Sequence, residues 1–162
     1  MKVAILTISD KGSRGEREDL SGPAIAECLA SLEHEIIWKG VVPDEMEQIE
    51  QTLCKLSDEQ GADLILTTGG TGLSPRDVTP EATMHVADRE VPGISEALRA
   101  QTAAKARNAM LSRGVSVTRG HTLIINFPGS PKAVRECMEI VLPVLNHAVS
   151  VLKGTVSECA AR

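Results

Sequence analysis

The segment best suited to binding a ligand is a run of glycine and threonine residues from Thr67 to Gly72. Glycine lets a backbone approach a ligand closely, and free N–H groups and threonine hydroxyls can donate hydrogen bonds to a phosphate. A tight turn would account for one glycine but hardly for three. The run lacks the Gly-Lys-Ser/Thr sequence of a P-loop and the spacing of a dinucleotide fingerprint. It therefore predicts an anion-binding loop of another kind, formed by Thr68, Gly69, Gly70, Thr71 and Gly72.

Two acidic residues outside this run, Asp44 and Asp77, could hold Mg²⁺ beside it. Hard cations take carboxylate oxygens as ligands, and a cation would offset the repulsion between these carboxylates and a polyphosphate. Each residue also has a structural interpretation. Asp44 precedes Glu47 by three residues, as in the capping box of a helix, and Asp77 fits a turn before Thr79. The residues alone leave both interpretations open.

Basic residues and a helix start could add to the binding of anions. Arg76 stands beside Asp77, where it either contacts a phosphate or pairs with a neighbouring carboxylate. Ser130 precedes Pro131, a pattern typical of an N-cap followed by the first helical residue. The free N–H groups of such a helix end attract anions, and Lys132 would strengthen that preference. Ser130 could equally be a cap and nothing more.

Covalent and zinc chemistry are both disfavoured. No serine or cysteine stands near a histidine in a recognisable nucleophile arrangement, so positioning and a metal ion remain as the means of catalysis. That combination suits the transfer of a phosphoryl or nucleotidyl group. The histidines and cysteines show no spacing of zinc ligands, and the cysteines are interpreted as small buried hydrophobes in a reducing compartment. These residues are His34, His85, His121 and His147, and Cys28, Cys54, Cys137 and Cys159.

Composition excludes several classes of partner. The 162 residues carry a net charge of −5 and fit one domain over residues 1–162. The negative net charge argues against a basic face for nucleic acid. With only Trp38 and Phe127 as aromatic residues, the chain also offers no platform on which bases could stack. No apolar run has the length of a membrane span or a signal peptide, and the terminal Cys159–Arg162 has the wrong last residue for prenylation. We expect a soluble, cytoplasmic protein.

Apolar runs alternate with segments of helical periodicity along the chain, which predicts one three-layer α/β/α domain with a mainly parallel sheet. In such a sheet, ligands bind beyond the carboxyl ends of the strands. The charged stretch Lys11–Asp19 would be a solvated loop or a lid over that edge. Pro143 is expected to kink or break the last helix. Strands are predicted at 3–8, 35–42, 63–68, 115–118 and 122–127, and helices at 25–32, 44–60, 79–88, 93–108 and from 130 onward.

Three motifs together resemble the Mog/MoaB family of molybdenum-cofactor biosynthesis. They are Leu66-Thr-Thr-Gly-Gly-Thr-Gly72, Arg76-Asp-Val-Thr-Pro80 and Pro128-Gly-Ser-Pro131, and the resemblance extends from Val3 to about Leu152. Shorter stretches are similar to the adenylyltransferase branch of that family: Val42–Glu45, Ile49–Cys54 and Val86–Glu90. The length of the chain is nearer to the MoaB branch, and Ser130 occupies a position that varies in the family.

The resemblance implies a function and a set of roles. It implies a trimer that transfers AMP from ATP to the terminal phosphate of molybdopterin, releases pyrophosphate and requires Mg²⁺. Asp44 and Asp77 would be the essential carboxylates that hold Mg²⁺ and orient the nucleotide. The molybdenum-insertion enzyme would be a further partner. Nucleotide and pterin contacts would come from the glycine run and from Ser9, Asp10, Ser74, Arg76, Pro128, Gly129 and Ser130.

Two other functions are compatible with the residues. A non-catalytic paralogue would bind molybdopterin as a carrier or scaffold and would not bind ATP. A nucleotide-phosphate hydrolase on the same fold would release phosphate in the absence of a pterin. Both aspartates and the intact glycine run favour the transferase.

Overall fold

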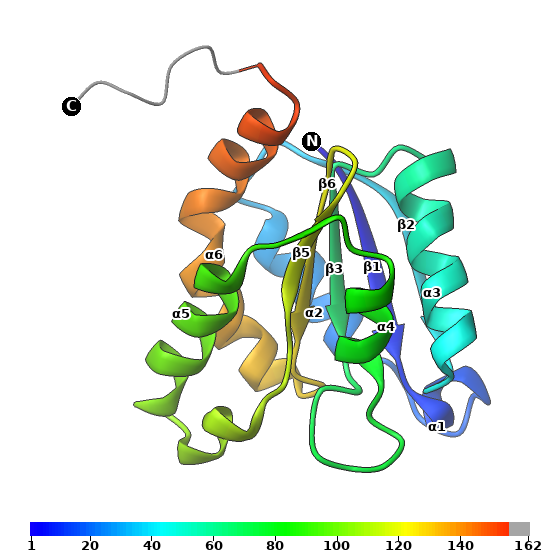
Figure 1. Ribbon diagram of the computed structural model, residues 1–162. Coiled ribbons are helices and arrows are strands. Elements are labelled where there is room, and N and C mark those ends of the chain that lie inside the picture. Colours follow the sequence, from blue (N-terminus) through cyan, green and yellow to red (C-terminus); the bar gives the residue numbers. More distant parts are fainter. Residues whose placement is uncertain (156–162) are drawn as a thin grey trace.

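Near-continuous apolar runs form the centre of the sheet. The computed structural model describes residues 1–155, and within them six strands form one sheet in the order β2-β1-β3-β6-β5-β4 (Figure 1). The first four in this order are parallel, and β5 and β4 are antiparallel to their neighbours. The strands are β1 (Lys2–Ile8), β2 (Glu35–Val42), β3 (Leu64–Thr68), β4 (Arg89–Glu90), β5 (Ser116–Arg119) and β6 (Thr122–Phe127).

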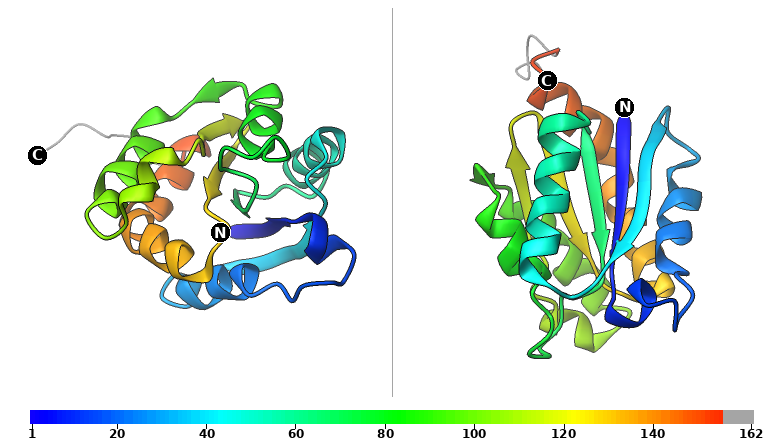
Figure 2. Two further views of the ribbon diagram at one scale, coloured as in Figure 1. Left: turned by 90° about the horizontal axis from the view of Figure 1, so that it is seen from below. Right: turned by 90° about the vertical axis from the view of Figure 1, so that its right-hand side faces the viewer.

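Helices cover both faces of the sheet, which explains why every residue of β3 and β6 is buried. Figure 1 shows α5 and α6 on one side and α3 and α4 on the other, and Figure 2 shows the same layers from two further directions. The α-helices are α1 (Asp10–Ser13), α2 (Ser21–Leu29), α3 (Met46–Cys54), α4 (Thr79–His85), α5 (Pro92–Ala103) and α6 (Pro131–Leu152). A π-helical turn (Lys55–Glu59) extends α3, and a 3₁₀ helix (Arg107–Leu111) follows α5.

The alternation of side chains along each strand divides the core into two layers. Val3 and Ile5 of β1 point into the layer formed with α2, α5 and α6. Ala4 and Leu6 point into the opposite layer, which α3 and α4 complete. Both layers consist mainly of buried aliphatic side chains, and Phe127 and Met138 add to the first of them. The predicted three-layer α/β/α architecture is confirmed.

Several predicted boundaries are wrong in detail. The last helix does not break at Pro143, because that proline lies on the exposed side while the buried stripe from Val134 to Val149 continues past it. Thr79 is not an N-cap: it is the first residue of α4, and its hydroxyl donates a hydrogen bond to the carbonyl of Gly69. The helix predicted over 93–108 ends at Ala103. Strand β4 carries too few residues for a periodicity to indicate it.

The cysteines differ in burial. Cys137 is buried, which agrees with its interpretation as a small buried hydrophobe, and burial raises the pKa of its thiol to about 12. Cys28 and Cys54 are only partly buried. Cys159, with the Cys159–Arg162 motif, lies outside the described residues.

Within residues 1–155, no helix combines the length and the apolar character that crossing a membrane requires.

Candidate active site

Four loops meet where the parallel strands end. The segment after β1 enters α1, β2 leads into Pro43–Glu45, β3 into residues 69–78, and β6 into residues 128–130. The left view of Figure 2 looks onto this end of the molecule. This is the edge at which a ligand is predicted to bind, because the carboxyl ends of parallel strands share one edge of a sheet.

Two glycines let the loop after β3 lie close to its neighbours. Gly69 and Gly70 have φ angles of 101° and 61°, a region in which residues with a side chain are strained. A Cβ atom on Gly69 would stand 2.2 Å from the carbonyl oxygen of Ile8, and one on Gly129 would stand 3.3 Å from the Cα atom of Gly69. The prediction of close backbone approach therefore applies to the protein's own strands as well as to any ligand.

Arg113 holds the glycine loop from outside, a role that no pattern in the sequence indicates. Its backbone N–H donates to the carbonyl of Thr71 at 2.9 Å, and its Nε donates to the carbonyl of Gly72 at 2.7 Å. The remaining guanidinium nitrogens reach the carbonyl of Asp77 and the carboxylate of Glu81. A lone arginine between a 3₁₀ helix and a strand has no sequence pattern that would reveal these partners.

Asp44 is bound to the loop after β1 and does not cap α3. The cap position of α3 is Glu45, and no side chain makes a capping hydrogen bond there. Oδ2 of Asp44 instead accepts the backbone N–H of Asp10 at 2.8 Å, and Oδ1 of Asp10 accepts the backbone N–H of Asp44 at 3.1 Å. The capping-box interpretation is wrong because the helix begins at Met46, one residue too late for it.

Charge and burial act differently on these two aspartates. Burial raises the pKa of Asp44, and the negative charges of Asp10 and Asp77 raise it further, against the hydrogen bond from the Asp10 N–H. The Arg76 guanidinium, by its hydrogen bonds, lowers the pKa of Asp10. Asp44 is thus a partly desolvated carboxylate near a second carboxylate, which is an environment that favours a cation.

Asp77 lies at the other side of the glycine loop. Its Oδ2 accepts the backbone N–H of Ser74 at 2.9 Å, which closes a turn on the side of Asp77 that faces the glycine loop in the sequence. A Cβ atom on Gly72 would stand 2.8 Å from that oxygen, so Asp77 and the loop are in contact. The predicted turn toward Thr79 is wrong, because the backbone N–H of Thr79 donates to the carbonyl of Gly70 and not to Asp77. The hydrogen bond from Ser74 occupies only one of the two carboxylate oxygens of Asp77.

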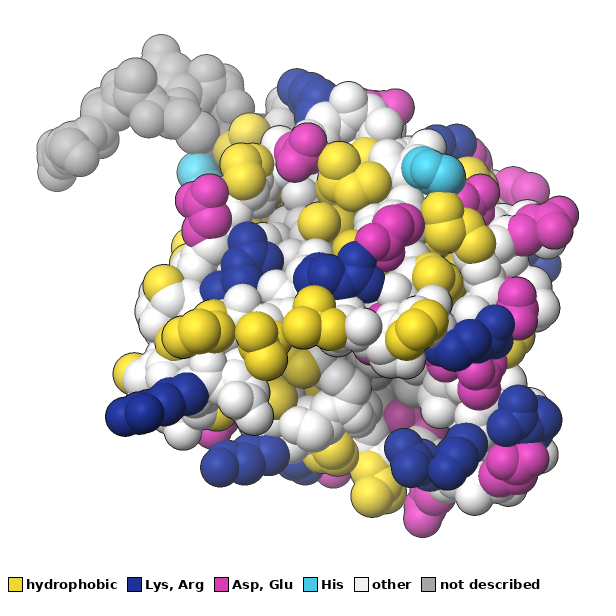
Figure 3. Space-filling model, turned by 60° about the horizontal axis from the view of Figure 1, so that its bottom comes forward, with side chains coloured by type: hydrophobic (Ala, Val, Ile, Leu, Met, Phe, Trp, Pro, Cys, Tyr) yellow, Lys and Arg dark blue, Asp and Glu magenta, His cyan; other side chains and the backbone are white. Residues whose placement is uncertain are grey.

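Two cavities lie side by side at this end, and Gly70, Asp77 and Gly129 line both of them. Figure 3 shows the area as a hollow with Lys and Arg side chains around it. The apolar cavity has a volume of about 590 Å³, and its lining includes Leu73, Ala106, Ala109, Leu111, Pro128, Ala133 and Cys137. The polar cavity has a volume of about 560 Å³, and its lining includes Thr7, Ser9, Arg17, Glu18, Asp19, Ser21, Asp44 and Thr68.

Most of the residues predicted for the site line one of these cavities. The exceptions are Asp10, Ser74 and Arg76, which make hydrogen bonds within the surrounding loops instead. Ser9 also accepts the backbone N–H of Gly12, as the cap of α1. The residues that line a cavity are Asp44, Thr68, Gly69, Gly70, Thr71, Gly72, Asp77, Pro128, Gly129, Ser130 and Ser9.

The helix start after β6 is as predicted. Ser130 is the N-cap of α6, and its hydroxyl accepts the backbone N–H of Ala133 at 3.2 Å. Ser130 also lines the polar cavity, so the cap and the site share this residue. Lys132 lies near Glu136 with an 83% exposed side chain and lines neither cavity.

The segment Lys11–Asp19 contributes more to the site than its composition indicated. It begins with α1, and its last residue, Asp19, accepts the backbone N–H groups of Ser21 and Gly22 and the hydroxyl of Thr7. An aspartate before Ser-Gly-Pro is a typical helix-start signal, and it could have indicated this role. Whether the segment moves as a lid stays a prediction.

The donor set suits a magnesium ion that arrives with a phosphate ligand. Among residues 1–155, no group of three or more His, Cys, Asp or Glu side chains could enclose a metal ion. Within the same residues, Oδ1 of Asp44 and Oδ1 of Asp77 accept no hydrogen bond, and a Cβ atom on Gly70 would stand 3.0 Å from the first of these oxygens. Mg²⁺ is commonly held by one or two carboxylates together with substrate phosphates, and these two oxygens fit that pattern.

The raised pKa of Asp44 predicts that the site is kept at a cost in stability. A carboxyl group with a raised pKa in the folded state loses stability as the pH rises from its usual value of 3.8 through the raised value. Asp44→Asn removes this cost, so we expect the variant to unfold at higher urea concentration than the wild type at neutral pH. The difference should vanish below the usual pKa, and a variant less stable than the wild type at neutral pH would contradict the assignment.

Comparisons with known proteins place these features in a wider group. A family described as "probable molybdopterin binding domain" matches residues 4–147. The chain is 42% identical over 154 residues to a molybdopterin adenylyltransferase from Helicobacter pylori, covering 94% of this chain and 88% of the relative. It is 45% identical over 142 residues to the molybdopterin adenylyltransferase of Escherichia coli, covering 86% and 72% of the two chains.

A solved structure agrees with the fold. The molybdopterin biosynthesis enzyme MoaB from Thermus thermophilus superimposes with a TM-score of 0.90 at 54% identity, over 94% of this chain and 96% of the other. The predicted resemblance to the Mog/MoaB family is confirmed by this similarity and by the family match.

Proposed function

This chain belongs to the family of probable molybdopterin binding domains, and on that premise we propose that it is a molybdopterin adenylyltransferase. The enzyme transfers AMP from ATP to the terminal phosphate of molybdopterin and releases pyrophosphate. Relatives that are 42% and 45% identical over most of the chain carry the name of this activity.

The observation that carries the proposal is the wall that the two cavities share. A transferase must hold two substrates with their reacting groups adjacent, because alignment of bound reactants supplies much of the rate. Two neighbouring cavities of about 590 and 560 Å³ provide that arrangement, and Asp77 and Gly70 lie at the point where they meet. A carrier of one pterin would need only one of them.

The reaction is a substitution at the α-phosphorus of ATP. An oxygen of the terminal pterin phosphate attacks this phosphorus, and the bond between the α-phosphorus and the oxygen that leads to the β-phosphorus breaks. The pyrophosphate leaves with the electrons of the broken bond. Bound Mg²⁺ would neutralise the charge that develops on the phosphate oxygens. No nucleophile of the protein takes part.

The chain's own residues bind and orient the substrates. Asp44 and Asp77 would hold Mg²⁺ through the carboxylate oxygens that accept no hydrogen bond within residues 1–155. The glycine loop and the N-terminus of α6 offer N–H groups to phosphate oxygens. Arg17 lines the polar cavity, where its positive charge would attract a phosphate group.

The proposal is tested by the release of pyrophosphate from purified components. Release should require ATP, Mg²⁺ and molybdopterin together, and it should stop when any one is omitted. Phosphate release without the pterin would identify a hydrolase. Calorimetric binding of molybdopterin without any binding of ATP and Mg²⁺ would identify a carrier.

The assembly and the setting of the enzyme are part of the same proposal. It acts as a homotrimer in the cytoplasm, and a molybdenum-insertion enzyme takes up its adenylylated product. Light scattering on the full chain should therefore give about three times the mass of the 17.2 kDa chain. A mass of one or two chains would contradict the trimer.

A further inference from the structure

We propose that Arg76 and Asp10 are positioning residues for adenylyl transfer, which hold the Asp44 carboxylate toward Asp77 without contacting either substrate. This inference rests on the proposed function and adds roles for two residues at the same site. It departs from the expectation that Asp10 and Arg76 contact the nucleotide or the pterin.

The first observation is a reciprocal pair of hydrogen bonds. The backbone N–H of Asp10 donates to Oδ2 of Asp44 at 2.8 Å, and the backbone N–H of Asp44 donates to Oδ1 of Asp10 at 3.1 Å. Each aspartate is thereby fixed to the backbone of the other, across the ends of β1 and β2. The pair leaves Oδ1 of Asp44 as the oxygen available to a ligand.

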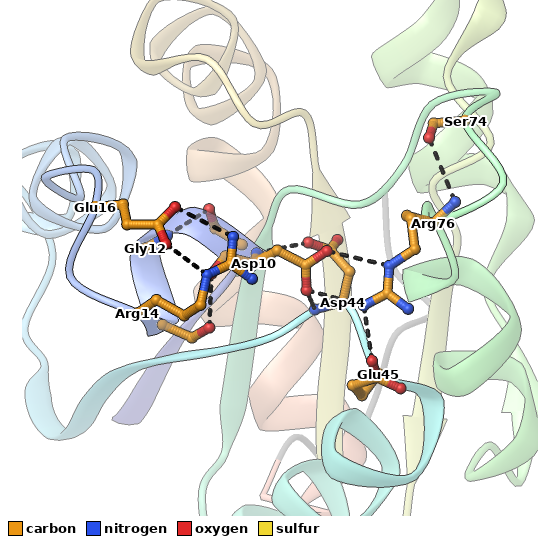
Figure 4. Close-up of polar contacts among 10 residues, drawn as sticks. Asp10, Gly12, Arg14, Glu16, Asp44, Glu45, Ser74 and Arg76 are labelled. Atoms are coloured by element: carbon orange, nitrogen blue, oxygen red, sulfur yellow. Dashed lines mark hydrogen bonds and ion pairs between the residues drawn. The ribbon is translucent and has the colours of Figure 1, made fainter.

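The second observation is the way Arg76 holds this pair. Its Nε donates to Oδ2 of Asp10 at 3.1 Å, and a terminal nitrogen donates to Oδ1 of Asp10 at 2.9 Å and to Glu45 at 2.7 Å (Figure 4). Such a two-pronged contact fixes the orientation of the carboxylate as well as its position. Because Arg76 directly precedes Asp77, it also ties the loop that carries Asp77 to the loop that carries Asp44.

The third observation is the position of the Asp10 and Arg76 side chains relative to the two cavities. Neither Asp10 nor Arg76 lines the apolar or the polar cavity. To reach a phosphate, Arg76 would have to give up its contacts with Asp10 and leave that carboxylate to repel Asp44. The pairing therefore favours support of Asp44 over contact with a substrate.

The energetics separate support of the site from support of the fold. The side chains of Arg76, Asp10 and Glu45 are 53%, 28% and 51% exposed, and ion pairs so open to water add little to stability. Their removal should leave the fold intact. A carboxylate displaced by even a fraction of an ångström, in contrast, lowers the rate of a reaction that depends on alignment.

The test is Arg76→Gln, assayed for pyrophosphate release on the full chain. We expect kcat to fall about 10- to 100-fold, as for other residues that support a metal-binding carboxylate. KM for ATP and for molybdopterin should stay within about threefold of the wild type, because no substrate contact is lost. Arg76→Lys should not restore kcat, because an ammonium group cannot make the two-pronged contact.

A double-mutant cycle and a distant control sharpen the test. If Arg76 acts through Asp10, the double variant Arg76→Gln/Asp10→Asn should be no slower than the slower single variant. Arg119 makes a similar two-pronged contact with Asp58 at the opposite end of the sheet, so Arg119→Gln should keep wild-type kcat. Multiplying effects in the double variant, or a large rise in either KM, would show direct substrate contact and overturn the proposal.

A readout without catalysis distinguishes this inference from the function on which it rests. Loss of Arg76 frees the Asp10 carboxylate, so hydrogen exchange at the Asp44 N–H should become faster in Arg76→Gln than in the wild type. Unchanged exchange would overturn the positioning role even in an active enzyme. If the wild-type protein showed no adenylyl transfer while exchange at the Asp44 N–H was still faster in Arg76→Gln, only the proposed function would be overturned.

Discussion

Replacing Asp77 by asparagine is expected to lower kcat for AMP transfer by about 100- to 1,000-fold, the usual cost of removing one electrostatic group that is aimed at the transition state. Asp77 lines both cavities, so in the proposed function its charge lies where the two substrates would meet. The asparagine carbonyl can still accept the N–H of Ser74, which keeps the turn closed. Pyrophosphate release measured at several Mg²⁺ concentrations would report this loss.

The control for that variant is an aspartate with the same local role elsewhere. Oδ2 of Asp88 accepts the backbone N–H of Gly120 at the far end of the sheet, so Asp88→Asn should retain the wild-type rate. Thermal unfolding of Asp77→Asn should stay close to that of the wild type. Full activity of Asp77→Asn at limiting Mg²⁺ would remove Asp77 from the catalytic residues.

Adding one methyl group at Gly70 is expected to damage both stability and activity. With φ at 61°, alanine is strained there, and its Cβ would stand 2.3 Å from Oγ1 of Thr79 and 3.0 Å from Oδ1 of Asp44. Strain and overlap together should lower the free energy of unfolding by about 2–4 kcal/mol. Because one of the two oxygens that the methyl group would displace is Oδ1 of Asp44, we also expect kcat to fall at least about tenfold.

Gly120→Ala separates the strain from the overlap. Gly120 has a φ of 53° and open space around the added atom, so this variant carries the backbone strain alone, about 1–2 kcal/mol. Its kcat should equal that of the wild type. Urea denaturation and the pyrophosphate assay on both variants give the comparison. Equal losses of unfolding free energy and of kcat in the two variants would mean that the overlap at Gly70 has no effect of its own.

The sequence was sufficient to predict the architecture because local patterns encode it. Continuous apolar runs indicated buried parallel strands, and Glu35–Val42 and Thr122–Phe127 were predicted to the residue. The rule that ligands bind at the carboxyl ends of such strands then selected the loops that line the two cavities. Short elements such as β4 could not be predicted, because two residues carry no periodicity and depend on pairing with β5.

The contacts inside the site were harder to predict, because they join residues far apart in the chain. Asp44 matched a capping box locally, yet its partner is Asp10, 34 positions earlier. Arg113 and the glycine loop are 41 positions apart at the Arg113–Gly72 contact. Thr79 has the form of an N-cap but donates to the loop after β3. In each case the tertiary partner replaces the local one, and a single sequence does not contain that choice.

The measurement that tests the central claim most directly follows labelled phosphorus from ATP into the products. With wild-type protein, Mg²⁺ and molybdopterin, the label of α-labelled ATP should appear on the pterin, and that of γ-labelled ATP should appear in pyrophosphate. That outcome would mean that the two cavities bring the pterin phosphate to the α-phosphorus. Label from the γ position on the pterin, or α label released as free AMP, would contradict adenylyl transfer.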